Sequence, residues 1–139
     1  MKLIDTCVVI AAADEDDALN GWAEKSIAKA VAAEGAGVSA ITLAELFSHA
    51  DSSVTIARVT GMGLKALDVP ATASELCGKA YKRYLARRKA DGITAGPKTP
   101  LADFFIGAHA ESMGFDIVTN DTDRFRKYFP SVKLITPRQ

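Results

Sequence analysis

The sequence predicts an α/β fold in which about five strands form a central parallel sheet within a single domain, residues 1–139. Short apolar runs alternate with longer segments of helical periodicity, which is typical of βαβ units. Glycine and proline separate many of these segments. Hydrophobic residues make up 48% of the chain and charged residues 24%, which is ordinary for a globular domain of this length. These observations favour one domain with one sheet.

The first half of the chain contains two predicted strands, each a short apolar run. Three predicted helices accompany them, and the first has apolar residues at helical spacing and ends at Gly35 and Gly37. The predicted strands are residues 3–4 and 37–39, and the predicted helices are residues 19–31, a segment beginning near Thr42, and residues 54–62.

The second half follows the same alternation. Pro70 ends the third predicted strand, and Pro100 suits the first position of a helix. Residues 89–100 have the composition of a loop, which we expect to be mobile. The remaining predicted strands are residues 67–69, 116–119 and 133–136, and the remaining predicted helices are residues 73–85, 100–113 and 125–128.

Four acidic residues fall at junctions between these elements. Asp5 and Asp121 directly follow predicted strands, whereas Glu45 and Asp103 lie in the first turns of helices. In an open parallel sheet, ligands bind beyond the carboxyl ends of the strands. We therefore expect the four carboxylates to meet at that edge.

Each acid also has a purely structural interpretation. Thr42 and Glu45 have the spacing of a capping box, Asp5 and Asp121 suit cap positions, and Asp103 complements a helix dipole. Together, however, crowded carboxylates repel one another unless a cation lies between them. Mg²⁺ or Mn²⁺ prefers such oxygen ligands and activates phosphodiesters toward hydrolysis. His49 and His109 lack ligand spacing, and we interpret them as surface or packing residues.

Four segments carrying these acids resemble, in order, the motifs of PIN-domain nucleases, and in particular those of VapC-like toxins. The resemblance covers nearly the whole chain. The segments are residues 3–10 (LIDTCVVI), 39–46 (SAITLAEL), 101–110 (LADFFIGAHA) and 118–125 (VTNDTDRF).

This resemblance implies a three-layer α/β/α sandwich and a Mg²⁺- or Mn²⁺-dependent endoribonuclease, with one or two ions, that cleaves structured RNA such as tRNA or rRNA. It also implies a homodimer that acts as the toxin of a VapBC-type pair and is neutralised by a small antitoxin protein. The implied catalytic and metal-binding residues are Asp5, Glu45, Asp103 and Asp121.

The resemblance also implies supporting residues. The hydroxyl groups of Thr6 and Thr119 are candidates to support a ligand or a water molecule, and Asp123 is either a helix cap or a peripheral ligand. Cys7 stands where relatives often have Asn or Ser, so a polar contact is expected to be missing there. Gly107, one turn beyond Asp103, either leaves room beside that carboxylate or serves helix packing.

Charge is unevenly distributed although the formal net charge is zero. Bases concentrate on the helix predicted over residues 73–85 and just beyond it, and such a patch attracts phosphates. We interpret Lys82, Arg83, Arg87 and Arg88 as candidate contacts to the RNA backbone. A solvated helix face is the alternative interpretation.

Other classes fit less well. The two separated cysteines and the absence of a long apolar run or signal peptide favour a cytoplasmic protein with no membrane association. A receiver domain would need a phosphorylatable Asp that ends the third strand, but Asp68 lies inside it. A phosphatase with a DxD loop would need a second Asp at position 7. The remaining alternative is a catalytically silent PIN module that binds RNA or a protein partner.

Overall fold

A computed structural model describes residues 1–137 of the chain. Five strands form one sheet, and every strand pair is parallel, as predicted. The strand order is β3-β2-β1-β4-β5, so the first strand of the sequence occupies the centre. The strands are β1 (Lys2–Ile4), β2 (Ala36–Ser39), β3 (Lys65–Leu67), β4 (Asp116–Val118) and β5 (Leu134–Ile135).

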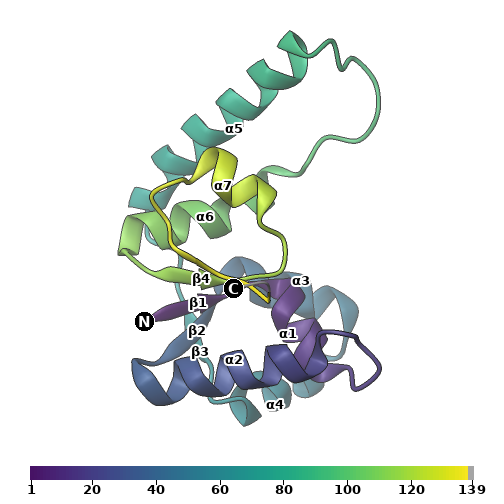
Figure 1. The fold of residues 1–139 in the computed structure, drawn as a ribbon, viewed down its shortest axis with the longest axis vertical. Coiled ribbons are helices and arrows are strands. Elements are labelled where there is room, and N and C mark those ends of the chain that lie inside the picture. The colour runs from purple at the N-terminus through teal and green to yellow at the C-terminus, as the bar shows by residue number, and fades with distance from the viewer. Residues whose placement is uncertain (138–139) are drawn as a thin grey trace.

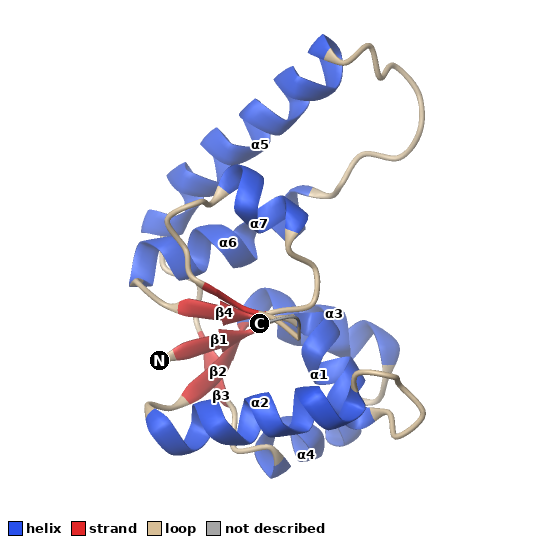
Figure 2. Cartoon of the chain, in the orientation of Figure 1, coloured by secondary structure: helices blue, strands red, loops and turns tan. Residues whose placement is uncertain are grey.

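Helices cover both faces of this sheet. In Figures 1 and 2, α5, α6 and α7 lie on one side of the strands, and α1, α2 and α4 lie on the other. The predicted three-layer α/β/α sandwich is thereby confirmed. The helices are α1 (Thr6–Ala13), α2 (Asn20–Ala33), α3 (Ala40–His49), α4 (Ser52–Gly61), α5 (Thr72–Ala90), α6 (Leu101–Met113) and α7 (Asp123–Tyr128).

The hydrophobic core is divided by the sheet into two clusters. Successive strand residues point to opposite faces, so Leu3 packs in the cluster beneath α5 and α6, whereas Ile4 packs in the cluster beneath α1 and α2. Ile117 and Val118 of β4 divide in the same way. All four side chains are fully buried, which explains why these strands read as continuous apolar runs.

Phe104 of α6 is the centre of an aromatic group between α5, α6 and α7. Its ring is fully buried, and its centroid lies 5.1 Å from that of Tyr81 and 5.2 Å from that of Tyr84. The rings of Tyr128 and Phe129 lie at 5.4 and 6.4 Å. These separations are typical of favourable aromatic pairs. The group fixes α6, and with it the neighbouring Asp103, against the rest of this layer.

Two helix starts differ from what the sequence predicted: one helix was not predicted, and another begins earlier than expected. Helix α1, which begins directly after Asp5, was not predicted, because its apolar residues lie on all sides and lack an amphipathic period. Helix α3 begins at Ala40 and is capped by Ser39, whose hydroxyl accepts a hydrogen bond from the Ile41 amide. Thr42 is therefore buried inside the helix and does not form the predicted capping box.

Smaller corrections concern element ends and one glycine. The third strand is Lys65–Leu67, two residues earlier than predicted, and α5 continues through Ala90 into the predicted loop. A Cβ atom at Gly107 would lie only 2.2 Å from Cδ2 of Phe129. Gly107 is therefore required for the packing of α6 against Phe129, and the alternative of room beside Asp103 is not needed to explain it.

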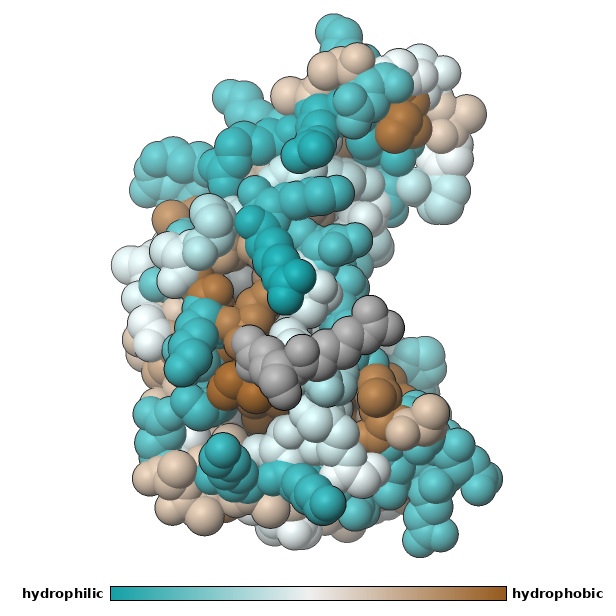
Figure 3. Space-filling model, in the orientation of Figure 1, coloured by the Kyte–Doolittle hydropathy of each residue, from teal (hydrophilic) through white to brown (hydrophobic). Residues whose placement is uncertain are grey.

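The far end of α5 and the loop that follows it extend away from the sheet, as Figure 1 shows. The space-filling view shows a hollow in the outline on the side toward which the strands run (Figure 3). None of the helices within residues 1–137 combines the length and the apolar character needed to span a bilayer.

Candidate functional site

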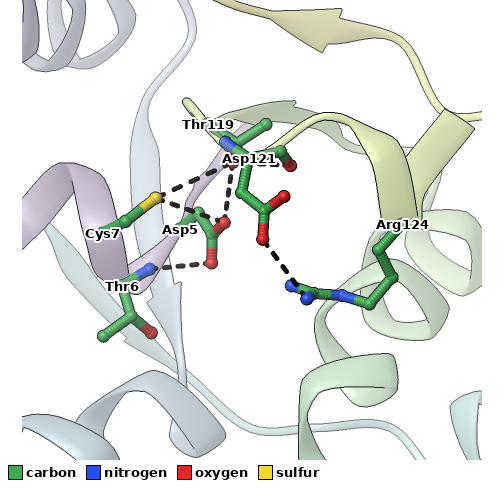
Figure 4. A network of polar contacts seen from close by, with 6 residues as sticks. All are labelled: Asp5, Thr6, Cys7, Thr119, Asp121 and Arg124. Atoms are coloured by element: carbon green, nitrogen blue, oxygen red, sulfur yellow. Dashed lines mark hydrogen bonds and ion pairs between the residues drawn. The ribbon is translucent and has the colours of Figure 1, made fainter. Parts of the chain in front are cut away.

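Strand pairing places Asp5 and Thr119 side by side. Ile4 and Val118 are partners in the parallel register of β1 and β4, so the residues that follow them leave the sheet at the same edge. The Asp5 amide still donates to the Val118 carbonyl at 3.0 Å. At this edge the Thr119 hydroxyl donates to Oδ2 of Asp5 at 2.7 Å (Figure 4). The two motifs that carry these residues therefore meet although 114 positions separate them.

Asp5 is a buried carboxylate, with 6% of the residue exposed. Its Oδ1 accepts from the Thr6 amide at 2.9 Å, which caps α1, and the Cys7 thiol lies 3.5 Å from Oδ2. Burial raises the pKa of Asp5 above its usual range, although the hydrogen bond from Thr119 and the charge of Arg124 oppose that rise. The surrounding protein therefore compensates the negative charge of Asp5 only in part.

Cys7 contributes the polar contact that the sequence interpretation expected to be missing. Its Sγ lies 3.5 Å from Oδ2 of Asp5 and 3.8 Å from the Thr119 hydroxyl. Burial, together with the charge of Asp5, raises the pKa of this thiol to about 11. The thiol is therefore protonated at neutral pH and can donate to the carboxylate.

Glu45 reaches the same site from α3. Its Oε1 lies 3.2 Å from the Thr6 hydroxyl, which in turn lies 3.0 Å from the buried hydroxyl of Thr42. Burial raises the pKa of Glu45, and the charges of Asp103 and Asp5 raise it further. The mutual repulsion expected from the sequence is thus present in the structure.

All four predicted acids line one pocket of about 270 Å³ at the carboxyl edge of the sheet. Asp103 is held there by the first turn of α6, and Asp121 by the segment after β4. Its lining residues are Asp5, Thr6, Cys7, Ile10, Glu45, Asp103, Ile106, Asp121 and Arg124.

The other predicted residues lie at different depths. Thr119 is buried beneath Asp5, whereas Asp123 is exposed in the first turn of α7. Of the four basic residues predicted to contact RNA, Lys82, Arg83 and Arg87 are exposed and Arg88 is half-buried. Arg83 donates to the Tyr128 carbonyl at 3.0 Å, and Arg88 to the carbonyl groups of residues 95–97 at 3.4–3.5 Å.

Arg124 belongs to the site but was not predicted. It follows Asp121 by three residues, and its Nη1 lies 3.4 Å from Oδ2 of Asp121 (Figure 4). The guanidinium carbon lies 5.0 Å from the centre of the Phe125 ring. The three-residue spacing between Asp121 and Arg124 was visible in the sequence. The predicted helix began at residue 125, however, whereas α7 begins at Asp123 and includes Arg124.

The donor set suits a hard divalent cation, because four carboxylates face one pocket without a competing imidazole or thiolate. Within residues 1–137, however, no three acidic, histidine or cysteine side chains are positioned to hold one metal ion. The carboxylate of Asp121 is turned toward Arg124, and both oxygens of Asp5 accept hydrogen bonds (Figure 4). The residues therefore fit such an ion by chemistry, and holding it requires side-chain movement.

The unfavourable burial of Asp5 predicts a pH-dependent gain in stability for Asp5→Asn. A raised folded-state pKa means that Asp5 stabilises the fold only while protonated, and this contribution is lost as pH rises through that pKa. We expect the unfolding free energy of Asp5→Asn, relative to wild type, to increase from about pH 4 to pH 7. Urea unfolding followed by circular dichroism measures it. A difference that is constant or decreases with pH would show that the charged carboxylate is well compensated.

Comparison with known proteins identifies similar sequences and folds. A family model of the PIN domain matches residues 2–129. Solved structures with a similar fold include VapBC2 from Rickettsia felis bound to a DNA fragment from their promoter, with a TM-score of 0.65, 19% identity and 97% of each chain covered. DNA-bound VapBC from Salmonella typhimurium has a TM-score of 0.62 and 24% identity, with 98% of each chain covered. A toxin–antitoxin complex from Klebsiella pneumoniae has a TM-score of 0.67 and 18% identity, with 99% of this chain and 98% of that chain covered. No match was found among curated protein sequences.

Proposed function

This chain belongs to the PIN domain family, and from that premise we propose that it is a Mg²⁺- or Mn²⁺-dependent endoribonuclease acting on structured RNA. PIN domains are generally nucleases, so the proposal concerns the substrate and the cofactor. The observation that carries it is the convergence of Asp5, Glu45, Asp103 and Asp121 on one pocket. The Cys7 thiol in this pocket is protonated at neutral pH, so a water molecule is the better attacking group.

In this proposal the four acids hold one or two divalent cations. A cation bound there supplies positive charge to the phosphodiester and to the attacking water. Thr119 and the Thr6 amide orient Asp5 through hydrogen bonds of 2.7 and 2.9 Å, and the Thr6 hydroxyl lies 3.2 Å from Glu45. These contacts restrict the rotamers of two ligands, which is the role of the groups around a metal site.

The basic side chains of α5 provide a second part of the proposal. Lys82 is exposed and can approach an RNA backbone. Arg87 is also exposed, and its Nε lies 4.0 Å from Oδ2 of Asp91, an exposed ion pair weak enough to open toward a phosphate. Arg83 and Arg88 also donate to protein carbonyl groups, so their contribution to RNA binding is expected to be smaller. Because phosphate contacts release counterions, RNA binding through this helix should weaken as salt increases.

We further propose that the protein is a homodimeric toxin of a VapBC-type pair and is neutralised by a small antitoxin. The support comes from the structural neighbours, several of which are VapBC or toxin–antitoxin complexes that match this chain over nearly its whole length. Their identities to this chain are below 25%, so the shared biological role depends on a direct test.

The direct test incubates purified protein with total RNA from the source organism in Mn²⁺ or Mg²⁺, beside EDTA and an Asp103→Asn variant. We expect discrete RNA products that require both the metal and the intact acid. Sequencing the new ends identifies the substrate. If folded, antitoxin-free protein bound RNA without cleaving it, the catalytically silent PIN module would be the better description.

A further inference from the structure

Arg124 is a cation inside the carboxylate pocket to which the proposed chemistry gives no role. Its side chain is 18% exposed, and its guanidinium group lies between the Phe125 ring and the Asp121 carboxylate. The Nε atom is buried and has no hydrogen-bond partner within residues 1–137. An arginine that leaves a buried N–H unpaired pays a desolvation penalty. This position therefore requires a favourable interaction that offsets that penalty.

The interaction is with the excess negative charge of the pocket. The positive charge of Arg124 lowers the pKa of Asp5 and of Glu45, opposing the effect of their burial. Arg124 lines the same pocket as the four carboxylates, so its charge acts on Asp5, directly after β1, and on Glu45 of α3 as well as on its neighbour Asp121. The Arg124–Asp121 pair alone, in which the Asp121 side chain is 55% exposed, contributes little, so the charge of the whole pocket is the larger effect.

The same pair determines where Asp121 points. Its Oδ2 faces Nη1 of Arg124, whereas Asp5 is directed toward Thr6 and Thr119 (Figure 4). Asp121 and Asp5 therefore do not point to a common centre. This is one reason why no three ligand side chains converge among the described residues. Releasing Asp121 from Arg124 would free one carboxylate oxygen for the pocket.

We propose that Arg124 is a positioning residue that serves as the resident counter-ion of the carboxylate pocket, and that a divalent cation must displace it from Asp121. The inference rests on the proposed metal site. Binding of the cation and the Arg124–Asp121 contact are mutually exclusive, so Arg124 weakens cation binding in the absence of RNA. The displaced guanidinium is then available to a phosphate group, two oxygens of which arginine binds through parallel hydrogen bonds.

The test measures Mn²⁺ affinity without RNA, by isothermal titration calorimetry, for wild type and Arg124→Met. Methionine retains an apolar stem that can pack on Phe125 but lacks the charge. Arg126→Met is the matched control, because Arg126 is exposed on the same helix and lines a different pocket with Pro130 and Lys133. Arg124→Lys retains the charge without the planar group. Thermal unfolding establishes that each variant is folded.

We expect Arg124→Met to bind Mn²⁺ at least about fivefold more tightly than wild type, a coupling at the lower end of those usual between linked sites. Arg124→Lys should lie between the two, and Arg126→Met should match wild type. Unchanged or weaker affinity in Arg124→Met, with wild type binding Mn²⁺, would overturn the inference and leave the proposed function intact. If neither protein bound Mn²⁺, the metal site and the inference would fail together. If Arg124→Met were unfolded, Arg124→Lys decides between the same outcomes.

Discussion

Asp5→Asn is expected to reduce metal-dependent RNA cleavage by at least about 100-fold, because even groups that only support a metal ligand contribute 10–100-fold. Asparagine retains an oxygen that can accept from the Thr6 amide, so the cap of α1 can persist. It lacks the negative charge that attracts a divalent cation. Initial cleavage rates at saturating Mn²⁺ measure the effect.

A matched control separates chemistry from folding. Asp116 is also a strand carboxylate, but it lies at the opposite end of β4 and pairs with Lys2 at 2.9 Å. Asp116→Asn should therefore cleave RNA at close to the wild-type rate. The unfolding free energy of Asp5→Asn, measured at the pH of the cleavage assay, shows whether any lost activity comes from unfolding. Retention of more than a tenth of the wild-type rate would argue against Asp5 as a metal ligand.

Phe104→Ala is expected to lower the free energy of unfolding by about 3–5 kcal/mol, the usual cost of removing a fully buried aromatic ring. The substitution would leave a cavity among Tyr81, Tyr84, Tyr128 and Phe129. Their rings come from α5 and from the region of α7, so they cannot all close around alanine without moving helices. Denaturant unfolding monitored by circular dichroism gives the change.

Phe47→Ala is the matched comparison, since Phe47 is 42% exposed on α3. Removing this ring creates no enclosed cavity, and the expected loss is below about 1 kcal/mol. Similar losses in the two variants would mean that the aromatic group around Phe104 does not hold the second helical layer.

The parallel sheet and the convergence of the four acids on one edge were predictable, because both follow from patterns along the sequence. Leu3 and Ile4 read as a buried strand because both faces of the sheet are covered. Asp5 and Asp121 follow strands, and parallel pairing brings such positions to one edge whatever the strand order. The order itself was not predicted, since it depends on which strands pair across more than one hundred residues.

The errors have local physical causes. Helix α1 was missed because it is apolar all round, and a helix covered on several sides has no amphipathic period. The Thr42–Glu45 spacing of a capping box was coincidental, because Ser39 already caps the helix. Arg124 was missed because its role depends on the charges of Asp5 and Glu45, which approach it only through tertiary structure.

The strand order has a consequence for synthesis of the chain. The central strand β1 is made first, but its partner β4 follows after more than one hundred residues, so the contact order of this sheet is high. A nascent chain that has emerged only through α5 exposes Asp5 and Glu45, whereas Asp103 and Asp121 have not yet emerged. The proposed nuclease site can therefore assemble only after Asp121 has emerged, so a shorter nascent chain on the ribosome lacks at least one of the four acids.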